Sequence, residues 1–311
     1  MTTEYRRLGK AGTRVSAISL GSWLTYGGSV ENDMATQCIH TAIDNGVNFI
    51  DTADAYAAGE AERVVGAAIR ERNRADLVIS SKLYWPISDN VNDRGLSRKH
   101  IMESIDKSLR NLGTDYLDIY FCHRFDPETP LEETVRAMSD LVHAGKIVYW
   151  GTSVWEAGQI EDAVKLAREY GGYPPQVEQP RYNMLDRHIE EQIMPATAHH
   201  GIGLTVFSPL AQGILTGKYN DGIPEGSRAA ERGMTNDLTE DNLSKARQLT
   251  SIADEHGMPM SQLALAWILR RPEISSVIIG ASKPEQVLEN LKAAETKLDD
   301  DVIRRIDTIL G

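Results

Sequence analysis

The stretch that decides the fold reads Val47-Asn48-Phe49-Ile50-Asp51-Thr52-Ala53-Asp54-Ala55-Tyr56. A β-rich run ends at the carboxylate of Asp51, and a turn of small and polar residues then presents Tyr56. This order is typical of an active-site rim on a parallel β/α scaffold, where catalytic groups sit on the loops that leave the strands. Tyr56 is then a proton donor that Asp51 helps to tune. The alternative is a plain turn, in which Asp51 and Asp54 satisfy backbone groups and Tyr56 is a packed aromatic.

Strand-like and helix-like runs alternate on both sides of this stretch. A small β-hairpin is expected first, from Tyr5 to Leu8 and from Thr13 to Ser16. Strands are then expected at 17–20, 47–50, 77–80, 116–121, 147–150, 176–178, 204–206 and 276–279, and helices at 33–45, 60–72, 97–112, 130–143, 156–170, 187–200, 240–256, 260–270, 284–294 and 299–310. The pattern predicts an α/β fold, a (β/α)8 TIM barrel with an N-terminal β-hairpin and extra C-terminal helices. A doubly wound sheet is the alternative.

A polar residue stands at or just past the carboxyl end of every predicted strand. These residues are Ser22, Asp51, Lys82, His123, Ser153, Gln179, Ser208 and Ser282. In a closed barrel the carboxyl ends of the strands converge on one rim, so we expect one site there. The long, Gly-rich segment 210–236 is expected to be a lid or clamp, because loops of this length are usually functional.

Composition limits the classes of function. The 311 residues are expected to form a single domain, 1–311, since α/β barrels run to this length. With 33 basic against 45 acidic residues the net charge is -12, which argues against general nucleic-acid or anionic-membrane binding. The N-terminal sequence has no apolar core of a secretory signal, and no run is long enough to span a bilayer. A cytoplasmic location without membrane attachment is therefore expected.

Motifs of other chemistries are missing. The two cysteines, Cys38 and Cys122, form no CxxC pair, and there is no GxGxxG fingerprint after a strand, no HExxH and no EF-hand loop. Gly213 to Lys218 is not a P-loop, because Tyr219 stands where Ser or Thr would bind magnesium. The pair His199-His200 lies at a helix end, where surface capping is expected. No metal is predicted.

The constellation that remains is Asp51, Tyr56, Lys82 and His123, from three successive strand ends. A free tyrosine has a pKa of about 10, too high for an efficient acid at neutral pH. We expect a buried Lys82 ammonium to lower the Tyr56 pKa, with Asp51 keeping Lys82 charged and oriented. His123 would orient and polarise a carbonyl oxygen. Such a set suits carbonyl reduction, although taken singly Lys82 could be a rim ion pair and His123 a structural histidine.

Matching stretches along nearly the whole chain resemble the aldo-keto reductase superfamily. They are DTADAY (51–56), SSKLYW (80–85), RGLSRKHI (94–101), LGTDYLDIYFCHR (112–124), GKIVYWGTS (145–153), EQPRYN (178–183), FSPLAQGILTGKY (207–219) and GASKPEQVLEN (280–290). Within that superfamily the chain is most similar to the group of potassium-channel β-subunits and related bacterial reductases such as the glyceraldehyde-3-phosphate reductase. Many motifs in the correct order make this resemblance far more specific than any one motif.

The resemblance implies roles for residues at the matching positions. Tyr56 would be the general acid, with Asp51, Lys82 and His123 as its partners. NADPH/NADP+ would be the cofactor, and its binding residues would be Ser22, Trp23, Asp51, Ser153, Gln179, Phe207, Ser208, Pro209, Leu210, Gly213, Lys218, Arg228, Gly280, Ser282, Gln286, Glu289 and Asn290, with Lys283 as a further candidate. Ser153 and Gln179 would hold the nicotinamide carboxamide, Phe207 would stack on the ring, and the cations would meet phosphates.

Three positions depart from the family pattern. Ala57 and Ala61 replace the usual Gly after the tyrosine and Ser before the next Glu, so the loop is stiffer and a helix loses a Ser cap. Phe207 replaces Trp or Tyr, which keeps stacking but drops a polar group. Channel β-subunits carry Asn where His123 stands, so His123 favours a working reductase.

Two functions of different classes follow. The first is an NADPH-dependent reductase of aldehydes or ketones in which Tyr56 supplies the proton, and the second is an NADP(H)-binding regulatory subunit that senses redox state. A hydrolase or lyase that uses Asp51 and His123 is a weaker third. The small-molecule carbonyl substrate is expected to meet Trp23, Tyr84, Trp85 and Arg124, where Arg124 either favours an anionic substrate or forms a buried ion pair. A homo-oligomer is left open.

Overall fold

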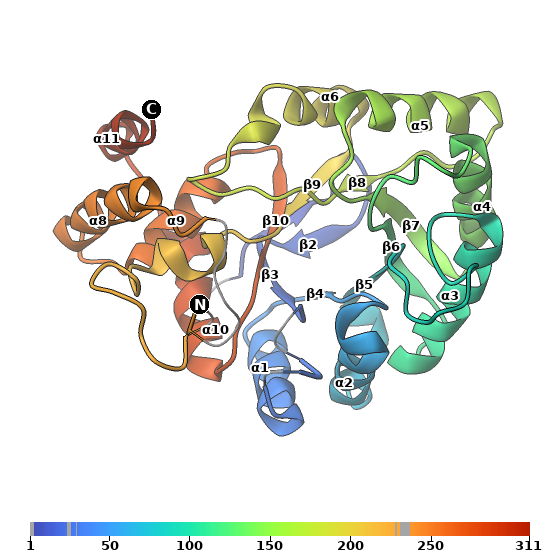
Figure 1. Cartoon of the computed structure of the whole chain (residues 1–311), viewed down its shortest axis with the longest axis horizontal. Coiled ribbons are helices and arrows are strands. Elements are labelled where there is room, and N and C mark those ends of the chain that lie inside the picture. Colours follow the sequence, from blue (N-terminus) through green and yellow to red (C-terminus); the bar gives the residue numbers. More distant parts are fainter. Residues whose placement is uncertain (1–2, 24–25, 29, 228, 231–236) are drawn as a thin grey trace.

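Eight parallel strands close into a barrel in the computed structural model, which describes residues 3–23, 26–28, 30–227, 229–230 and 237–311. The strands follow the order β10-β3-β4-β5-β6-β7-β8-β9, and β10 pairs with β3 to close the ring. They are β3 (Ile18–Gly21), β4 (Phe49–Asp51), β5 (Val78–Leu83), β6 (Leu117–Cys122), β7 (Ile147–Thr152), β8 (Val177–Glu178), β9 (Gly203–Val206) and β10 (Ile274–Ile279). The predicted (β/α)8 barrel is confirmed, and closure rules out the doubly wound sheet (Figure 1).

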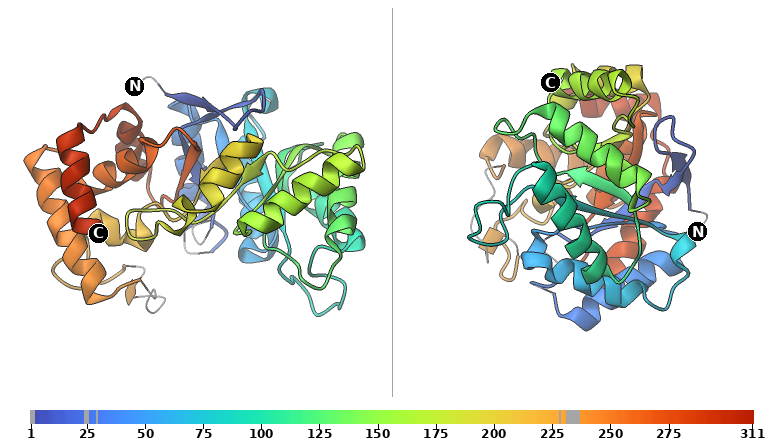
Figure 2. Two further views of the ribbon diagram at one scale, coloured as in Figure 1. Left: turned by 90° about the horizontal axis from the view of Figure 1, so that it is seen from above. Right: turned by 90° about the vertical axis from the view of Figure 1, so that its right-hand side faces the viewer.

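The predicted hairpin covers one end of the barrel. Its strands β1 (Tyr5–Arg7) and β2 (Arg14–Ser16) are antiparallel. Leu8 and Val15 are fully buried and pack with side chains from inside the barrel, among them Phe49, Phe121 and Val177. The turn approaches the start of β9 so closely that a Cβ on Gly9 would lie 2.3 Å from the Gly201 carbonyl oxygen. The hairpin lies at the N-terminal end of the chain, on one side of the barrel (Figure 2, left). Its apolar side chains fill this end of the barrel, and the site expected from the sequence belongs at the other end, where the strands end.

Helices surround the barrel and bury their apolar faces against the strands (Figure 1). They are α1 (Asn32–Asp44), α2 (Glu60–Ile69), α3 (Arg98–Leu112), α4 (Leu131–His143), α5 (Ala157–Glu169), α6 (Ile193–His200), α8 (Glu240–Glu255), α9 (Met260–Leu269), α10 (Pro284–Leu291) and α11 (Asp300–Leu310). Tight turns of 3-10 type are η1 (Tyr56–Gly59), η2 (Arg74–Asp76), η3 (His188–Glu190), η4 (Ala211–Thr216) and η5 (Lys292–Glu295). Within the described ranges no helix is long and apolar enough to cross a membrane.

The residues at the two ends of α3 show how the sequence determines where a helix begins and ends. The Ser97 hydroxyl accepts a hydrogen bond from the His100 amide, which caps the N-terminus. The helix ends at Gly113, whose φ of 65° is left-handed and is readily adopted by glycine. Between these ends Ile101, Ile105 and Leu112 are buried. The helix therefore packs on the barrel in one register.

Several expected elements differ in their bounds from the observed ones, among them the helix expected over 284–294, which is divided into α10 and η5. Two of the differences have a clear physical meaning. The helix expected over 187–200 is broken into η3 and α6, because the Pro195 ring would collide with the preceding turn and stops α6 from extending towards its N-terminus. The strand expected over 77–80 continues to Leu83 as β5, so Lys82 lies within the strand rather than after it. Its side chain is fully buried.

Candidate active site

A cavity of about 1300 Å³ opens at the carboxyl ends of the strands. Most residues predicted for the site line this single cavity: Trp23, Asp51, Tyr56, Trp85, His123, Arg124, Ser153, Gln179, Phe207, Ser208, Pro209, Leu210, Gly213, Lys218, Gly280, Ser282, Lys283, Gln286, Glu289 and Asn290. They come from the carboxyl ends of all eight barrel strands and the loops that follow them, and from α10 at the far end of the cavity. Residues spread over 268 positions of sequence are thus brought together by barrel closure.

A buried ion pair lies beneath the cavity. Lys82 Nζ donates to Asp51 Oδ2 at 2.6 Å and to the Thr52 carbonyl at 2.7 Å, and the lysine side chain is fully buried. Asp51 Oδ1 accepts from Ser80 Oγ at 2.7 Å and from Gln179 Nε2 at 3.0 Å. Asp51 therefore holds Lys82 instead of capping its own turn, and the plain-turn interpretation of this carboxylate is wrong.

Tyr56 and His123 face each other above this pair. Their rings meet edge to face with centroids 5.7 Å apart, and Lys82 Nζ lies 4.9 Å from the centre of the Tyr56 ring. Trp23 and Trp85 flank them, with ring centroids 6.5 Å from Tyr56 and 6.4 Å from His123. A phenol and an imidazole thus line one end of the cavity, with the Lys82 ammonium beneath them. The sequence predicted that these groups would come together.

Burial sets the protonation of these groups. It raises the pKa of Tyr56 well above its ordinary value, and the Asp51 carboxylate adds to this while Arg124 opposes it. Burial lowers the pKa of Lys82, with Asp51 acting against that change. It also lowers the pKa of His123 well below its ordinary value, aided by the charges of Lys82 and Arg124. His123 is consequently neutral at pH 7.

The expectation that Lys82 lowers the Tyr56 pKa is wrong for the protein by itself. The Lys82 charge is matched by Asp51 at 2.6 Å, so the pair offers little net positive charge to a phenolate. Desolvation of the phenolate is the larger effect. The phenol is therefore kept in its protonated form, which is the form of a proton donor.

A strained turn carries Tyr56. Ala57 and Ala58 both adopt left-handed conformations, with φ of 48° and 52°, and Gly59 follows at 87°. Left-handed backbone is unfavourable for a residue with a Cβ, so the surrounding structure imposes this turn. The position where alanine replaces the family's glycine is therefore one at which glycine fits better.

We expect Ala57→Gly to raise the free energy of unfolding by about 0.5–1 kcal/mol, because it relieves left-handed strain and loses only part of this in unfolded-chain entropy. Ala198→Gly, the same change at an exposed position of α6, should lower it by about 0.5–1 kcal/mol. Urea unfolding measures both. Equal losses in the two variants would show that the Ala57 turn stores no strain.

The family-model comparison matches the aldo/keto reductase family over residues 17–310. The chain belongs to this family. Its closed barrel and the four side chains at one rim agree with that assignment, and the resemblance drawn from the sequence motifs is confirmed.

Similar curated proteins are named as channel subunits. This aldo/keto reductase is 47% identical over 300 residues to a probable voltage-gated potassium channel subunit beta of Arabidopsis thaliana, covering 94% of this chain and 91% of the relative. It is 45% identical over 320 residues to a putative subunit of that name from Schizosaccharomyces pombe, with 99% and 93% covered, and 44% identical over 317 residues to a probable one from Oryza sativa subsp. japonica, with 99% and 96% covered. The expected group is thus represented among its relatives.

The cavity of this aldo/keto reductase suits a dinucleotide along its length. Consecutive residues Ala211, Gln212 and Gly213 are left-handed, as is Ser208, so the chain forms a tightly curled turn at the wall of the cavity. A Cβ on Gly213 would lie 2.7 Å from Lys218 Nζ, so the ammonium lies directly against this turn. The arrangement fits a pyrophosphate, and Phe207 offers a ring face at the wall of the same cavity.

Ser153 and Gln179, which the sequence predicted to hold a carboxamide, are in contact with each other. Ser153 Oγ donates to the Gln179 carbonyl at 2.9 Å, and Gln179 Nε2 reaches Asp51. Both side chains are buried and line the same cavity as Tyr56. A carboxamide would meet a hydroxyl and an amide there.

The far end of the cavity is polar. Gln286 Oε1 accepts from the Ser282 amide at 2.8 Å, and Ser261 Oγ donates to Glu289 Oε1 at 3.1 Å. The sequence prediction omitted Ser261, as it did Gln212 and Thr216. Its position in the first turn of α9 after Pro259 was a usable signal, but only the fold shows that this turn faces the cavity. Arg228, predicted for this end, lies outside the described residues.

Two predicted contacts are not part of the cavity wall. Ser22 is fully buried, and its hydroxyl donates to Thr52 Oγ1 at 2.8 Å, so it supports the strand end from behind. Tyr84 lies behind Trp85, with the two rings edge to face at 5.0 Å. Both are one position out of phase with the residues that face inwards, because successive side chains along an extended backbone point to opposite sides.

Proposed function

We propose that this aldo/keto reductase is an NADPH-dependent oxidoreductase that reduces small aldehydes or ketones to alcohols. The observation that carries the proposal is the convergence of Tyr56 and His123, above the Asp51–Lys82 pair, at one end of a cavity that continues to the Lys218 turn. A proton donor and an anion-binding turn are thus connected by one continuous space. This is the arrangement that a hydride donor with a pyrophosphate requires.

The protein residues handle the proton and the geometry. Bound NADPH supplies the hydride. His123, neutral at pH 7, donates a hydrogen bond that orients the carbonyl oxygen, and the Tyr56 phenol gives its proton to that oxygen. Asp51 fixes Lys82 under the Tyr56 ring, so that the ion pair supports the phenol from below. Trp23 and Trp85 flank the carbonyl site at the same end of the cavity.

A cationic clamp supports the preference for NADPH over NADH. Lys218 and Lys283 both line the cavity of a protein whose net charge is -12. Cations held locally on an acidic protein favour a ligand with an additional phosphate. The cofactor preference is measured by fluorescence titration of the protein with NADPH and with NADH.

Arg124 is available to an anionic substrate. Its guanidinium donates to the His123 carbonyl at 2.5 Å and lies 5.6 Å from the centre of the Trp85 ring. Within the described part of the chain it forms no ion pair, so the alternative of a structural ion pair, left open by the sequence, is wrong there.

We expect Arg124→Leu to raise KM for succinic semialdehyde roughly tenfold or more, because a hydrogen bond to a carboxylate is lost. KM for butanal, an uncharged aldehyde with the same carbon chain length, should change little. Steady-state assays with both substrates measure this contrast. Parallel losses for the two aldehydes would contradict an anion-binding role.

The second candidate is a regulatory subunit that binds NADP(H) with little turnover, and the names of the three curated relatives favour it. A panel of aldehydes, ketones and quinones separates the two proposals when binding of NADPH is measured in parallel. Turnover with any of them supports the reductase. Tight binding of NADPH without turnover supports the regulatory subunit.

A further inference from the structure

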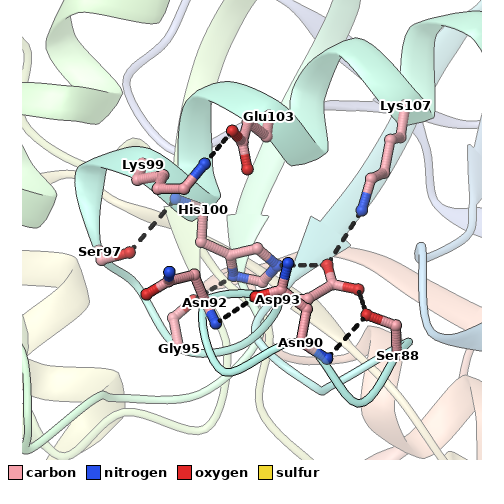
Figure 3. A network of polar contacts seen from close by, with 10 residues as sticks. All are labelled: Ser88, Asn90, Asn92, Asp93, Gly95, Ser97, Lys99, His100, Glu103 and Lys107. Atoms are coloured by element: carbon pink, nitrogen blue, oxygen red, sulfur yellow. Dashed lines mark hydrogen bonds and ion pairs between the residues drawn. The ribbon is translucent and has the colours of Figure 1, made fainter.

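The segment Tyr84–Ser97 joins β5 to α3 without a helix or strand, and its first residues reach the cavity. Trp85 lines the cavity, with its ring edge to face against both Tyr84 and His123. A long irregular segment holds an aromatic ring in one place only if its backbone is tied down. Figure 3 shows how this is done.

Asp93 is a buried carboxylate at the centre of a polar cluster that joins this segment to α3. Ser88 Oγ donates to Asp93 Oδ2 at 2.6 Å, and Lys107 Nζ, from α3, donates to Oδ1 at 3.0 Å (Figure 3). Asp93 is only 8% exposed, and the Ser88 hydroxyl and the Lys107 ammonium hold its pKa below its ordinary value. A charged carboxylate therefore joins the middle of the segment to the helix that follows it.

His100 carries the connection back to the cavity. Its side chain is buried, with Nε2 facing Asp93 Oδ1 at 3.5 Å and Nδ1 2.8 Å from the Gly95 carbonyl oxygen. The Gly95 amide in turn donates to the Tyr84 carbonyl at 2.8 Å, one residue before Trp85. A continuous path of polar contacts thus leads from Asp93 to the backbone that carries Trp85.

A separate contact fixes the other end of the segment. Asp126 Oδ2 accepts from the Leu96 amide at 2.7 Å and from Thr129 Oγ1 at 2.7 Å. Gly95 has a φ of +74°, and a Cβ there would lie 2.5 Å from the same carboxylate oxygen. With the base of the segment closed by Asp126, the Asp93 cluster determines where the rest of it lies.

Resting on the proposed reductase function, we propose that Asp93 is a positioning residue for the carbonyl substrate, because it sets the place of Trp85 through His100, Gly95 and Tyr84. Asp93 itself does not line the cavity, so it acts through Trp85. The cofactor-binding turn of Lys218 belongs to another part of the rim and is independent of it.

The test compares Asp93→Asn with Glu103→Gln. Glu103 also lies in Figure 3, on α3, but its partner is the exposed Lys99, so the control removes the same charge from an ion pair outside the cluster. For Asp93→Asn we expect KM for 4-nitrobenzaldehyde to rise about tenfold, since a hydrogen bond between charged groups is weakened. The kcat and the NADPH dissociation constant should stay unchanged, and Glu103→Gln should leave all three values as in the parent protein.

A second measurement does not depend on turnover. Acrylamide quenching of tryptophan fluorescence should increase in Asp93→Asn, and this increase should disappear when Trp85→Phe is added. Ser88→Ala removes one hydrogen-bond donor to Asp93 and keeps the ion pair of Asp93 with Lys107. It should raise the quenching and KM in the same direction but by less. This variant replaces Asp93→Asn in the test if Asp93→Asn does not fold. Unchanged quenching and KM, or a loss of NADPH affinity as large as the change in KM, would overturn the proposal. If the protein reduces no carbonyl at all, KM cannot be measured, and the quenching result alone decides whether Asp93 positions Trp85.

Discussion

Replacing Tyr56 by phenylalanine should slow carbonyl reduction by roughly 10²–10⁴-fold, the usual contribution of a general acid. The change removes one oxygen and keeps the ring that packs against Trp23 and His123. NADPH affinity should stay within about twofold, since a proton donor that acts in the transition state adds nothing to cofactor binding. Steady-state kinetics and a fluorescence titration with NADPH measure the two effects.

The control is Tyr170→Phe, which removes the same oxygen from an exposed ring at the end of α5 and should leave both measurements as they were. A loss of NADPH affinity in Tyr56→Phe that matched the loss of rate would place the phenol in cofactor binding instead. Retained reduction would end its role as the acid.

The pKa shifts of Tyr56 and His123 predict that the rate depends little on pH near neutrality. Because burial raises the pKa of Tyr56, the phenol stays protonated as pH rises through neutrality. Because burial lowers the pKa of His123, the imidazole stays neutral over the same range. We expect kcat to vary little between about pH 6 and pH 9. A steep fall across neutral pH would contradict the assignment of these two protonation states.

The second large effect concerns stability. Asp51→Asn should lower the free energy of unfolding by about 3–5 kcal/mol, because it leaves the Lys82 ammonium fully buried without its counter-charge. Reduction should be lost as well, since Gln179 and Ser80 also depend on this carboxylate. Urea unfolding followed by circular dichroism measures the first effect.

Two further variants separate charge from packing. Glu60→Gln breaks the exposed pair of Glu60 with Arg63 and should cost far less. Adding Lys82→Met to Asp51→Asn removes the unpaired charge and should recover much of the lost stability without recovering activity. If Asp51→Asn costs no more than Glu60→Gln, the buried pair is not a determinant of stability.

The sequence predicted the architecture because the relevant signals are local. Alternation of β-rich and helical runs gave the eight strands, and Ser97 and Gly113 marked the ends of α3 before the fold was known. The expected bounds were wrong where a proline or a neighbouring strand had more effect than the spacing of apolar residues. The helix expected before α6 is broken at a proline, and β5 continues over Lys82. Most residues that the sequence proposed for the site line one cavity, because the strand ends converge on one rim.

The sequence by itself thus determined the closed barrel and which polar residues would meet at its mouth, since both follow from spacing along the chain. Only the tertiary structure decided how those residues are charged and which of them face the cavity. Burial, which depends on the whole fold, raises the Tyr56 pKa that the sequence predicted to fall. The link from Asp93 to Trp85 likewise depends on contacts between separate elements, which no local pattern records.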